Sequence, residues 1–323
     1  MALDTAKTNS NTTSQAIKNR YYVQEFLKNA EVNFVHKQLG QMNRKVEQGQ
    51  GGYGTGVTYW TKWVRLPAVS AGQGEGFATT AVVLSAQNVT GSTAQYDQAV
   101  SISDIIAYTS FGDVMKAAIG ELAYSASLSI DTVVRNEVAN SGTAQIAASA
   151  ASVSAIPSTA YLLLNEVRRA VRTLDRNNAR RQSDGYYVAV AHPDSVFDLM
   201  GDTSTGGWID ANKYTDGNAE KLLKGEVGKL YGVRFLQTTN GYANAVSSIT
   251  GSGTVQHTSF FGSDAFGITE LQNLKTYVKG FGSGGTGDPT EKIATAGWKT
   301  TFGAAMLNST WAVNVKHMVS STA

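Results

Sequence analysis

The alternation of hydrophobic and polar positions is clearest over residues 57–66, VTYWTKWVRL. A period of two residues in a segment rich in aromatic and β-branched side chains is typical of a strand. Pro67 ends this strand, and the following AVSAGQGEGFATT has the composition of a flexible tip. Return strands are then expected over AVVLSAQNVTG and QAVSIS (98–103). The pattern predicts a long hairpin that projects outward, because so long a connection is uncommon inside a compact domain.

Two segments carry the period of three to four residues that marks an amphipathic helix. The first, 113–140, predicts a helix roughly 40 Å long. The second, 158–177, begins after a proline, and Ser158 is the expected N-cap. The Ala/Ser-rich segment 141–156 between them is predicted to be a low-complexity linker and a domain boundary.

The order of elements in the second half predicts an α/β unit followed by further strands. YYVAVA (186–191) is a continuous apolar run, as in a strand covered on both faces. HPDSVFDLM (192–200) predicts a helix, GVRFLQTTN (232–240) another strand, and 240–258 a loop or insertion.

The final strands are expected over LKTYVKGF (274–281), WKTTFGAAML (298–307) and STWAVNVKHM (309–318). The last two are predicted to form one antiparallel sheet that packs on the long helix 113–140. The fold class is therefore α+β.

Residues 1–56 have the composition of an arm. They are polar, end in Gly-rich GQGGYGTG, and contain one amphipathic piece, YYVQEFLKNAEVNFVHKQL (21–39). Termini of this kind are poorly ordered unless a neighbour holds them. Two interpretations follow, a solvated tail or an arm that docks on another subunit.

The amino-acid composition argues against several classes of function. The chain has 323 residues, of which 33 are Gly and 16% are charged, which suits a β-rich protein with extensive protein–protein contact. The net charge of +2 argues against a nucleic-acid binder that acts through overall charge, and zero Cys excludes disulfides and thiol catalysis. Neither a signal peptide nor a membrane span is expected, so the chain is interpreted as soluble and made in a cytoplasm.

Gly282, Gly284 and Gly287 have the G-x-G-x-x-G spacing of a dinucleotide-binding loop. That loop must open a helix and be followed by an acidic residue about 20 positions later. Here a strand is predicted next, and no Asp or Glu occurs after Glu291. A P-loop is excluded because Asp288 stands where its Lys is required.

No other catalytic pattern is present. The four His are scattered, DANKYTDG (210–217) departs from a calcium loop, and no G-x-S-x-G occurs. His192 and Asp194 flank a proline, where a helix start is favoured over an acid–base role. The prediction is a protein that is not an enzyme, with no cofactor and no metal.

The segment RRAVRTLDRNNARR (168–181) has six Arg against one Asp. A solvated or subunit-facing helix surface is favoured over contact with phosphates. The side chains concerned are Arg168, Arg169, Arg172 and Arg176.

The second half contains an ordered series of motifs: YYVAVAHPDSVFDLMGD, GGWIDANKYTDG, GEVGKLYGVRFLQTTN, FFGSDAFGI and VKGFGSGGTGDPTEKIATAGWKTTFGAAMLN. In this order they resemble the major capsid proteins of tailed bacteriophages, in particular the branch typified by the coat protein of phage N-four. The resemblance covers roughly residues 55–318 and is most specific over 186–308.

The resemblance implies the Hong-Kong-97-type capsid fold. The parts it implies are an N-terminal arm (1–55), an E-loop hairpin (56–103), a peripheral domain with a spine helix and a long antiparallel sheet (104–156 and 266–323), and an axial α/β domain (157–265).

The resemblance also implies a function: self-assembly through hexamers and pentamers into the icosahedral head that encloses the double-stranded DNA of a tailed phage, with assembly in the host cytoplasm. Implied partners are copies of the chain, a scaffolding protein, a portal, a decoration protein and non-specifically packaged DNA, without a membrane. An encapsulin-like storage shell of the same fold is the alternative, and a nucleotide-dependent enzyme is a third, disfavoured one.

A shell protein buries much of its surface against its own copies, so exposed aromatic side chains are expected on the hairpin. The glycines would lie on a turn of the peripheral sheet where subunits meet. The subunit-contact candidates are Tyr59, Trp60, Lys62, Trp63, Arg65, Gly282, Gly284 and Gly287.

Overall fold

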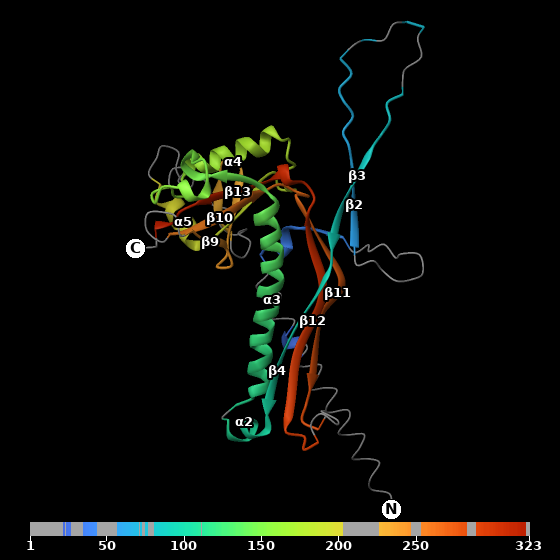
Figure 1. Ribbon diagram of the computed structural model, residues 1–323, viewed down its shortest axis with the longest axis vertical. Helices are drawn as coiled ribbons and strands as arrows, with labels where there is room; N and C mark the ends of the chain where they lie inside the picture. Colours follow the sequence, from blue (N-terminus) through green and yellow to red (C-terminus); the bar gives the residue numbers. More distant parts are fainter. Residues whose placement is uncertain are drawn as a thin grey trace, which may run out of the picture.

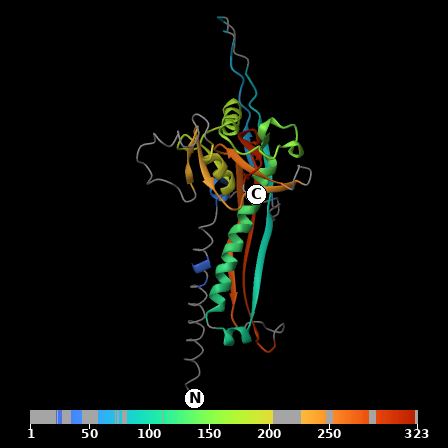
Figure 2. The same cartoon turned by 90° about the vertical axis from the view of Figure 1, so that its left-hand side faces the viewer.

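A computed structural model shows an elongated molecule with three parts (Figures 1 and 2). A stem of one long helix and a long sheet carries an α/β unit at one end, and a hairpin projects beyond that end. The structure describes residues 22, 24–26, 35–43, 57–70, 72, 75–76, 81–110, 112–202, 226–246, 253–282 and 289–320.

Helix α3 (Val114–Ser141) is the spine of the stem and confirms the helix predicted over 113–140. The Asp113 side chain accepts a hydrogen bond from the Lys116 amide and so caps its first turn. At 1.5 Å per residue the 28 residues span about 42 Å. Its buried stripe contacts the long sheet through Ile119, Leu122, Ala123, Ala126, Ile130 and Val134.

The long sheet has the strand order β1–β11–β12–β4 and packs along α3. Strands β11 and β12 pair antiparallel over almost their full lengths, and β4 adds on the other side of β12. The short helix α2 (Asp104–Thr109) follows β4 at the far end of the stem (Figure 1). The strands are β1 (Gln41–Asn43), β11 (Phe266–Lys279), β12 (Ile293–Met306) and β4 (Ala94–Ser103).

The second sheet has seven strands in the order β5–β13–β10–β6–β8–β7, with β9 paired to β10. Helix α4 (Leu164–Arg176) packs on one face, and α5 (Pro193–Met200) follows β6 as predicted for 192–200. The strands are β5 (Thr143–Ile146), β13 (Ala312–His317), β10 (Gly253–Phe261), β6 (Tyr187–Ala191), β8 (Val233–Gln237), β7 (Glu226–Leu230) and β9 (Tyr242–Val246).

The middle of this sheet is covered on both faces, which explains the continuous apolar run in β6. Tyr187 and Ala189 lie in the core that includes α4. Val188 and Val190 lie in the core shared with the end of α3 and the long sheet. Because successive strand residues point to opposite faces, five consecutive buried positions require a layer on each side. The α/β unit and the stem therefore share a hydrophobic cluster where they meet.

Two local predictions are wrong. The segment 141–156 is not an unstructured linker, since it contains β5 and the 3-10 turns Ala147–Ser149 and Val153–Ala155. The segment 240–258 is not a loop, since β9 and most of β10 fall within it. Strands β5 and β9 are short, and β10 lies inside the sheet but begins with the polar stretch GTVQHTS, so these segments carry little of the alternation on which the prediction depended.

Two further predictions, one about a helix start and one about strand pairing, are also wrong. Ser158 is not an N-cap, because α4 begins at Leu164, whose amide donates instead to Asp202 Oδ2 at 2.9 Å. The last two strands do not share a sheet. Strand β12 pairs with β11 and β4, whereas β13 crosses to the seven-stranded sheet and pairs with β10 and β5.

Two buried histidines in the seven-stranded sheet predict acid sensitivity. Desolvation lowers the pKa of His317 to about 4, although the Met318 carbonyl and Asp198 oppose it. Burial, Lys316 and His317 lower the pKa of His257 to about 4 as well. The unfolded chain therefore binds more protons than the folded chain between pH 6.5 and 4, so stability is complete above pH 6.5 and falls as pH is lowered.

We expect each histidine to remove up to about 3 kcal/mol of unfolding free energy between pH 6.5 and 4. Urea unfolding at several pH values measures this loss. A His257→Phe, His317→Gln double variant should give a flatter profile over that range. A profile as steep as that of the wild type would contradict the assignment to these two groups.

Candidate interaction surfaces

The projecting hairpin is built from β2 (Val57–Trp63) and β3 (Ala86–Ser92), which pair antiparallel from Val57–Ser92 to Trp63–Ala86. Beyond this ladder the two segments that follow β2 and precede β3 continue away from the body without strand structure (Figure 1). Five apolar side chains of these segments are exposed: Leu66 56%, Val69 88%, Val82 63%, Val83 86% and Leu84 54%. Single exposed apolar residues are ordinary, but a projecting group of five indicates a surface that another molecule covers.

Trp60 does not belong to that exposed surface, contrary to expectation. It is 8% exposed and packs against the long sheet. A Cβ on Gly267 of β11 would lie 2.7 Å from its indole ring, and one on Gly91 of β3 would also lie 2.7 Å from it. The two glycines thus leave space for the ring, which fixes the base of the hairpin to its own subunit.

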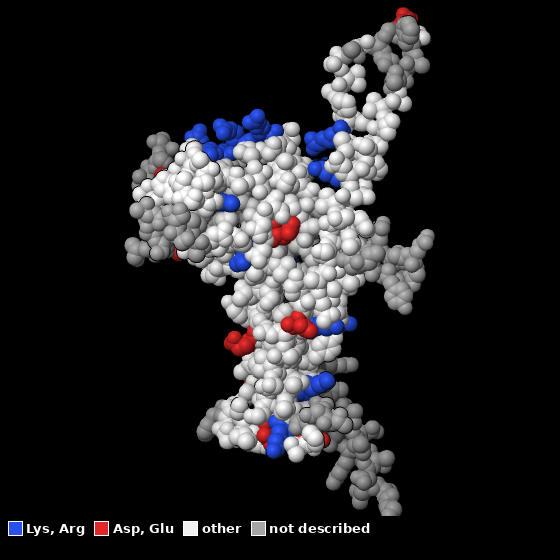
Figure 3. Space-filling model, in the orientation of Figure 1, with Lys and Arg blue, Asp and Glu red and all other residues white. Residues whose placement is uncertain are grey.

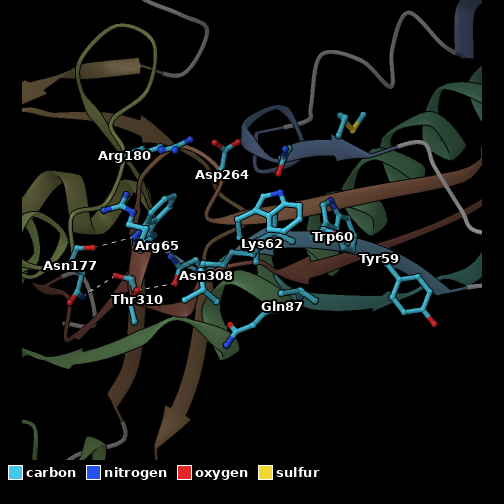
Figure 4. Close-up of a pocket in the computed structure, with 18 residues that line it drawn as sticks. Tyr59, Trp60, Lys62, Arg65, Gln87, Asn177, Arg180, Asp264, Asn308 and Thr310 are labelled. Atoms are coloured by element: carbon cyan, nitrogen blue, oxygen red, sulfur yellow. Dashed lines mark hydrogen bonds between the residues drawn. The ribbon is translucent and has the colours of Figure 1, made fainter. Parts of the chain in front are cut away.

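The other hairpin candidates lie at the surface. Tyr59 is 37% and Trp63 60% exposed, and Lys62 and Arg65 are exposed too. With Trp60 they line a groove of about 1030 Å³ between the hairpin base and the α/β unit (Figure 4). The opposite wall includes Asn177, Arg180, Asp264, Asn308 and Thr310.

The described part of the N-terminal arm is held at the centre of the molecule by Asp131 of α3. Asp131 Oδ1 accepts the backbone amides of Val35 at 3.1 Å, His36 at 2.7 Å and Lys37 at 3.3 Å. Its Oδ2 lies 2.8 Å from His36 Nδ1 and accepts from Asn240 Nδ2 at 3.2 Å. Burial raises the pKa of Asp131, but the hydrogen bonds and charge of His36 and the Lys37 amide offset this, so the pKa is lowered overall.

Neighbouring contacts extend this attachment. Lys37, in the 3-10 turn Lys37–Leu39, forms an ion pair with Glu270 at 2.5 Å. Strand β1 then pairs parallel with β11, and Phe26, which is 0% exposed, packs with the distal part of α3. Of the predicted amphipathic piece 21–39, the described residues 22 and 24–26 are helical. No pattern in the sequence indicates this attachment, because the arm is held mainly by one Asp on a distant element.

Three of the four arginines named for the predicted helix 158–177 lie at the surface of α4, which begins only at Leu164. Arg168, Arg172 and Arg176 are exposed on α4. Arg169 is partly buried and forms an ion pair with Glu166 at 2.7 Å. Arg168 also lies over the Tyr231 ring at 5.9 Å.

The glycines of the G-x-G-x-x-G motif lie after a strand and not before a helix. Gly282 follows β11 in a turn and has a φ of +88°, a conformation that favours glycine. Gly284 and Gly287 lie outside the described residues. The next described element is β12, so a helix N-terminus for phosphate is absent from the described residues on both sides of the motif.

A second exposed apolar surface, which the sequence reasoning missed, lies on α2 at the far end of the stem. Ile105 is 68%, Ile106 51% and Tyr108 85% exposed. The signal available was the run DIIAYT, whose apolar residues are adjacent and not spaced for one buried face.

The described residues also bear on membrane insertion and metal binding. In the described ranges no helix is long and apolar enough to cross a membrane. Among the same residues no three His, Asp or Glu side chains come together as metal ligands would. The calcium-like segment 210–217 lies outside them.

No protein-family model matches the chain, and no curated protein matches it significantly. Solved structures do match. The capsid of Ralstonia phage GP4 has a TM-score of 0.69 at 12% identity over 91% of both chains. The capsid of the cyanophage P-SCSP1u has a TM-score of 0.63 at 13% identity over 87% of both chains. The head of Helicobacter pylori bacteriophage KHP40 has a TM-score of 0.64 at 8% identity, over 89% of this chain and 91% of that chain.

These similarities extend over nearly the whole chain at very low identity, so what they show is the fold. The chain has the α+β fold of phage capsid proteins, and the Hong-Kong-97-type fold that the sequence resemblance implies is confirmed.

Proposed function

We propose that this chain is the major capsid protein of a tailed phage, which assembles through hexamers and pentamers into an icosahedral head around double-stranded DNA. The observation that carries the proposal is the projecting hairpin, whose apolar side chains have no cover in the described subunit. The likeness to phage capsids over nine tenths of the chain supports the same function.

The two exposed apolar surfaces fit this role in different ways. The hairpin lies at one end of the elongated molecule and α2 at the other (Figures 1 and 2). A contact between surfaces at opposite ends of two copies is heterologous, and such contacts generate rings when the rotation between the copies closes. We assign no catalytic role, and we expect the chain in the virion after assembly in a bacterial cytoplasm.

Several finer assignments belong to the same proposal. They are membership of the branch typified by phage N-four, the division into arm, E-loop, peripheral and axial domains, and partnership with scaffolding, portal and decoration proteins. The encapsulin-like shell is the second candidate. The matched structures of phage capsids favour a virion, and nucleic acid inside purified particles would distinguish the two.

Light scattering behind a size-exclusion column tests the proposal on the full chain, with and without co-expressed scaffold. We expect masses five and six times the 34.3 kDa subunit, or larger closed assemblies. A chain that stays monomeric under both conditions would refute it.

A hairpin variant separates assembly from folding. Val69→Ser with Val83→Ser changes side chains that are 88% and 86% exposed, so the unfolding free energy of the monomer should change by less than about 0.5 kcal/mol per site. Assembly should nevertheless fail, because the covering subunit loses its apolar contacts. Assemblies of wild-type mass and yield would show that the hairpin is not an interface.

A further inference from the structure

The positive charge on and just after α4 comes from arginine side chains alone. Between residues 164 and 185 there are six Arg and no Lys. Arg168, Arg172 and Arg176 are exposed and recur every four residues, so they form a row about 12 Å long on one helix face. Figure 3 shows basic side chains gathered along the edge over α4, while most of the visible surface carries no charge.

The acidic residues near this row are already engaged elsewhere. Glu166 pairs with Arg169 at 2.7 Å, and Asp175 pairs with Arg181 at 3.1 Å. In the described structure Arg172 and Arg176 have no ion pair. Like charges four residues apart destabilise a helix by about 0.2–0.5 kcal/mol per pair. The row is therefore unfavourable in the isolated subunit and would be stabilised by an anionic partner.

The row continues into the groove beside the hairpin. The chain leaves α4 at Arg176 and reaches Arg180, which lines the groove opposite Lys62 and Arg65 (Figure 4). Asp264 is the single acidic residue of the described lining. We call this surface the basic strip; it comprises Lys62, Arg65, Arg168, Arg172, Arg176 and Arg180.

We propose that the basic strip binds the phosphate backbone of double-stranded DNA without regard to sequence. Guanidinium groups match phosphate oxygens with paired hydrogen bonds, and a linear row suits a linear polyanion. A 12 Å row spans roughly seven phosphate charges of a duplex. The inference rests on the proposed function, because a shell around DNA brings this partner to the chain.

A second copy of the chain is the competing occupant. The α/β unit of a second copy fits less well, because the acidic residues in its described part are largely paired internally. Glu166 and Asp175 have the partners given above, and Asp184 pairs with Arg234. The described part of that unit offers no acidic row that could match the arginines.

The test is fluorescence anisotropy of a short labelled duplex titrated with the full chain between about 50 and 200 mM salt. The test variant is Arg168→Gln, Arg172→Gln, Arg176→Gln. Losing three phosphate contacts should lower the slope of log affinity against log salt by about 2.7, so wild-type affinity falls roughly 40-fold further over this range. The charge-matched control replaces Lys275, Lys279 and Lys299 of the long sheet with Gln and should retain the wild-type slope.

Particle mass is measured on the same variants. A test variant that loses DNA affinity and still assembles supports the proposal. Equal salt slopes for test variant and control overturn it. Loss of assembly with unchanged DNA binding also overturns it and assigns the strip to contact between copies. A wild-type chain that binds DNA through the strip but never assembles contradicts the proposed function and leaves this inference standing.

Discussion

Replacing Asp131 with asparagine is expected to lower the unfolding free energy by about 3 kcal/mol, because a buried carboxylate that accepts several hydrogen bonds is lost and each hydrogen bond to a charged group contributes about 1.5–3 kcal/mol. The Asp131 carboxylate is 1% exposed and accepts three backbone amides of the arm as well as the His36 ring. An amide side chain keeps one acceptor oxygen for the backbone amides but places an NH2 group where Oδ2 accepts from Asn240 and contacts the His36 ring, so it replaces only part of these bonds.

Hydrogen exchange locates the effect within the chain. The amides of Val35, His36 and Lys37 should lose protection by 100-fold or more, since about 1.4 kcal/mol corresponds to a factor of ten. Glu121→Gln removes an exposed acidic charge from the same helix and should change little. Unchanged protection of the three amides in the Asp131 variant would show that this carboxylate does not hold the arm.

Trp60→Ala is expected to release the hairpin from the long sheet. Truncating a buried Trp costs about 3–5 kcal/mol, and a two-stranded hairpin without packing is marginally stable. The space left by Gly91 and Gly267 would be empty, so the ribbon would lose its main contact with the stem. Exchange of the β2 and β3 amides should accelerate at least 100-fold, and assembly should fail with it.

Trp63→Ala is the matched control, because it changes the same residue type on the same strand. Trp63 is 60% exposed, so the monomer should keep its stability while assembly weakens. If Trp60→Ala and Trp63→Ala had equal effects on hairpin exchange, the proposed attachment through Trp60 would be wrong.

These two sites mark the limit of what sequence patterns predict. The helix α3 and the hairpin strand β2 follow from the periodicity of their apolar residues, and the strand β6 follows from its unbroken apolar run. Trp60 alternates with exposed residues as any strand residue does, and only the distant Gly267 reveals which neighbour it packs against. The attachment at Asp131 is a contact between elements about 95 residues apart, for which one sequence provides no signal.

The errors in chain topology have a related cause. Because β12 and β13 are adjacent in sequence, the sequence pattern predicts that they pair with each other. In the structure β13 instead pairs with β10 and β5 of the other sheet. Consecutive strands are usually neighbours, so the chain departs here from a general tendency. Arg168, Arg172 and Arg176 lie on the exposed face of α4, whereas Arg169 is partly buried against Glu166. The ion pairs that engage Glu166 and Asp175, and so leave Arg172 and Arg176 without one, are visible only in three dimensions.

Electron microscopy of the largest assembly formed by the full chain, alone and with scaffold, tests the central claim most directly. The account predicts closed shells with fivefold vertices and sixfold rings, in which each hairpin contacts a neighbouring subunit. A preparation that contains only monomers and irregular aggregates, although the subunit is folded, would contradict the claim that this chain builds a shell.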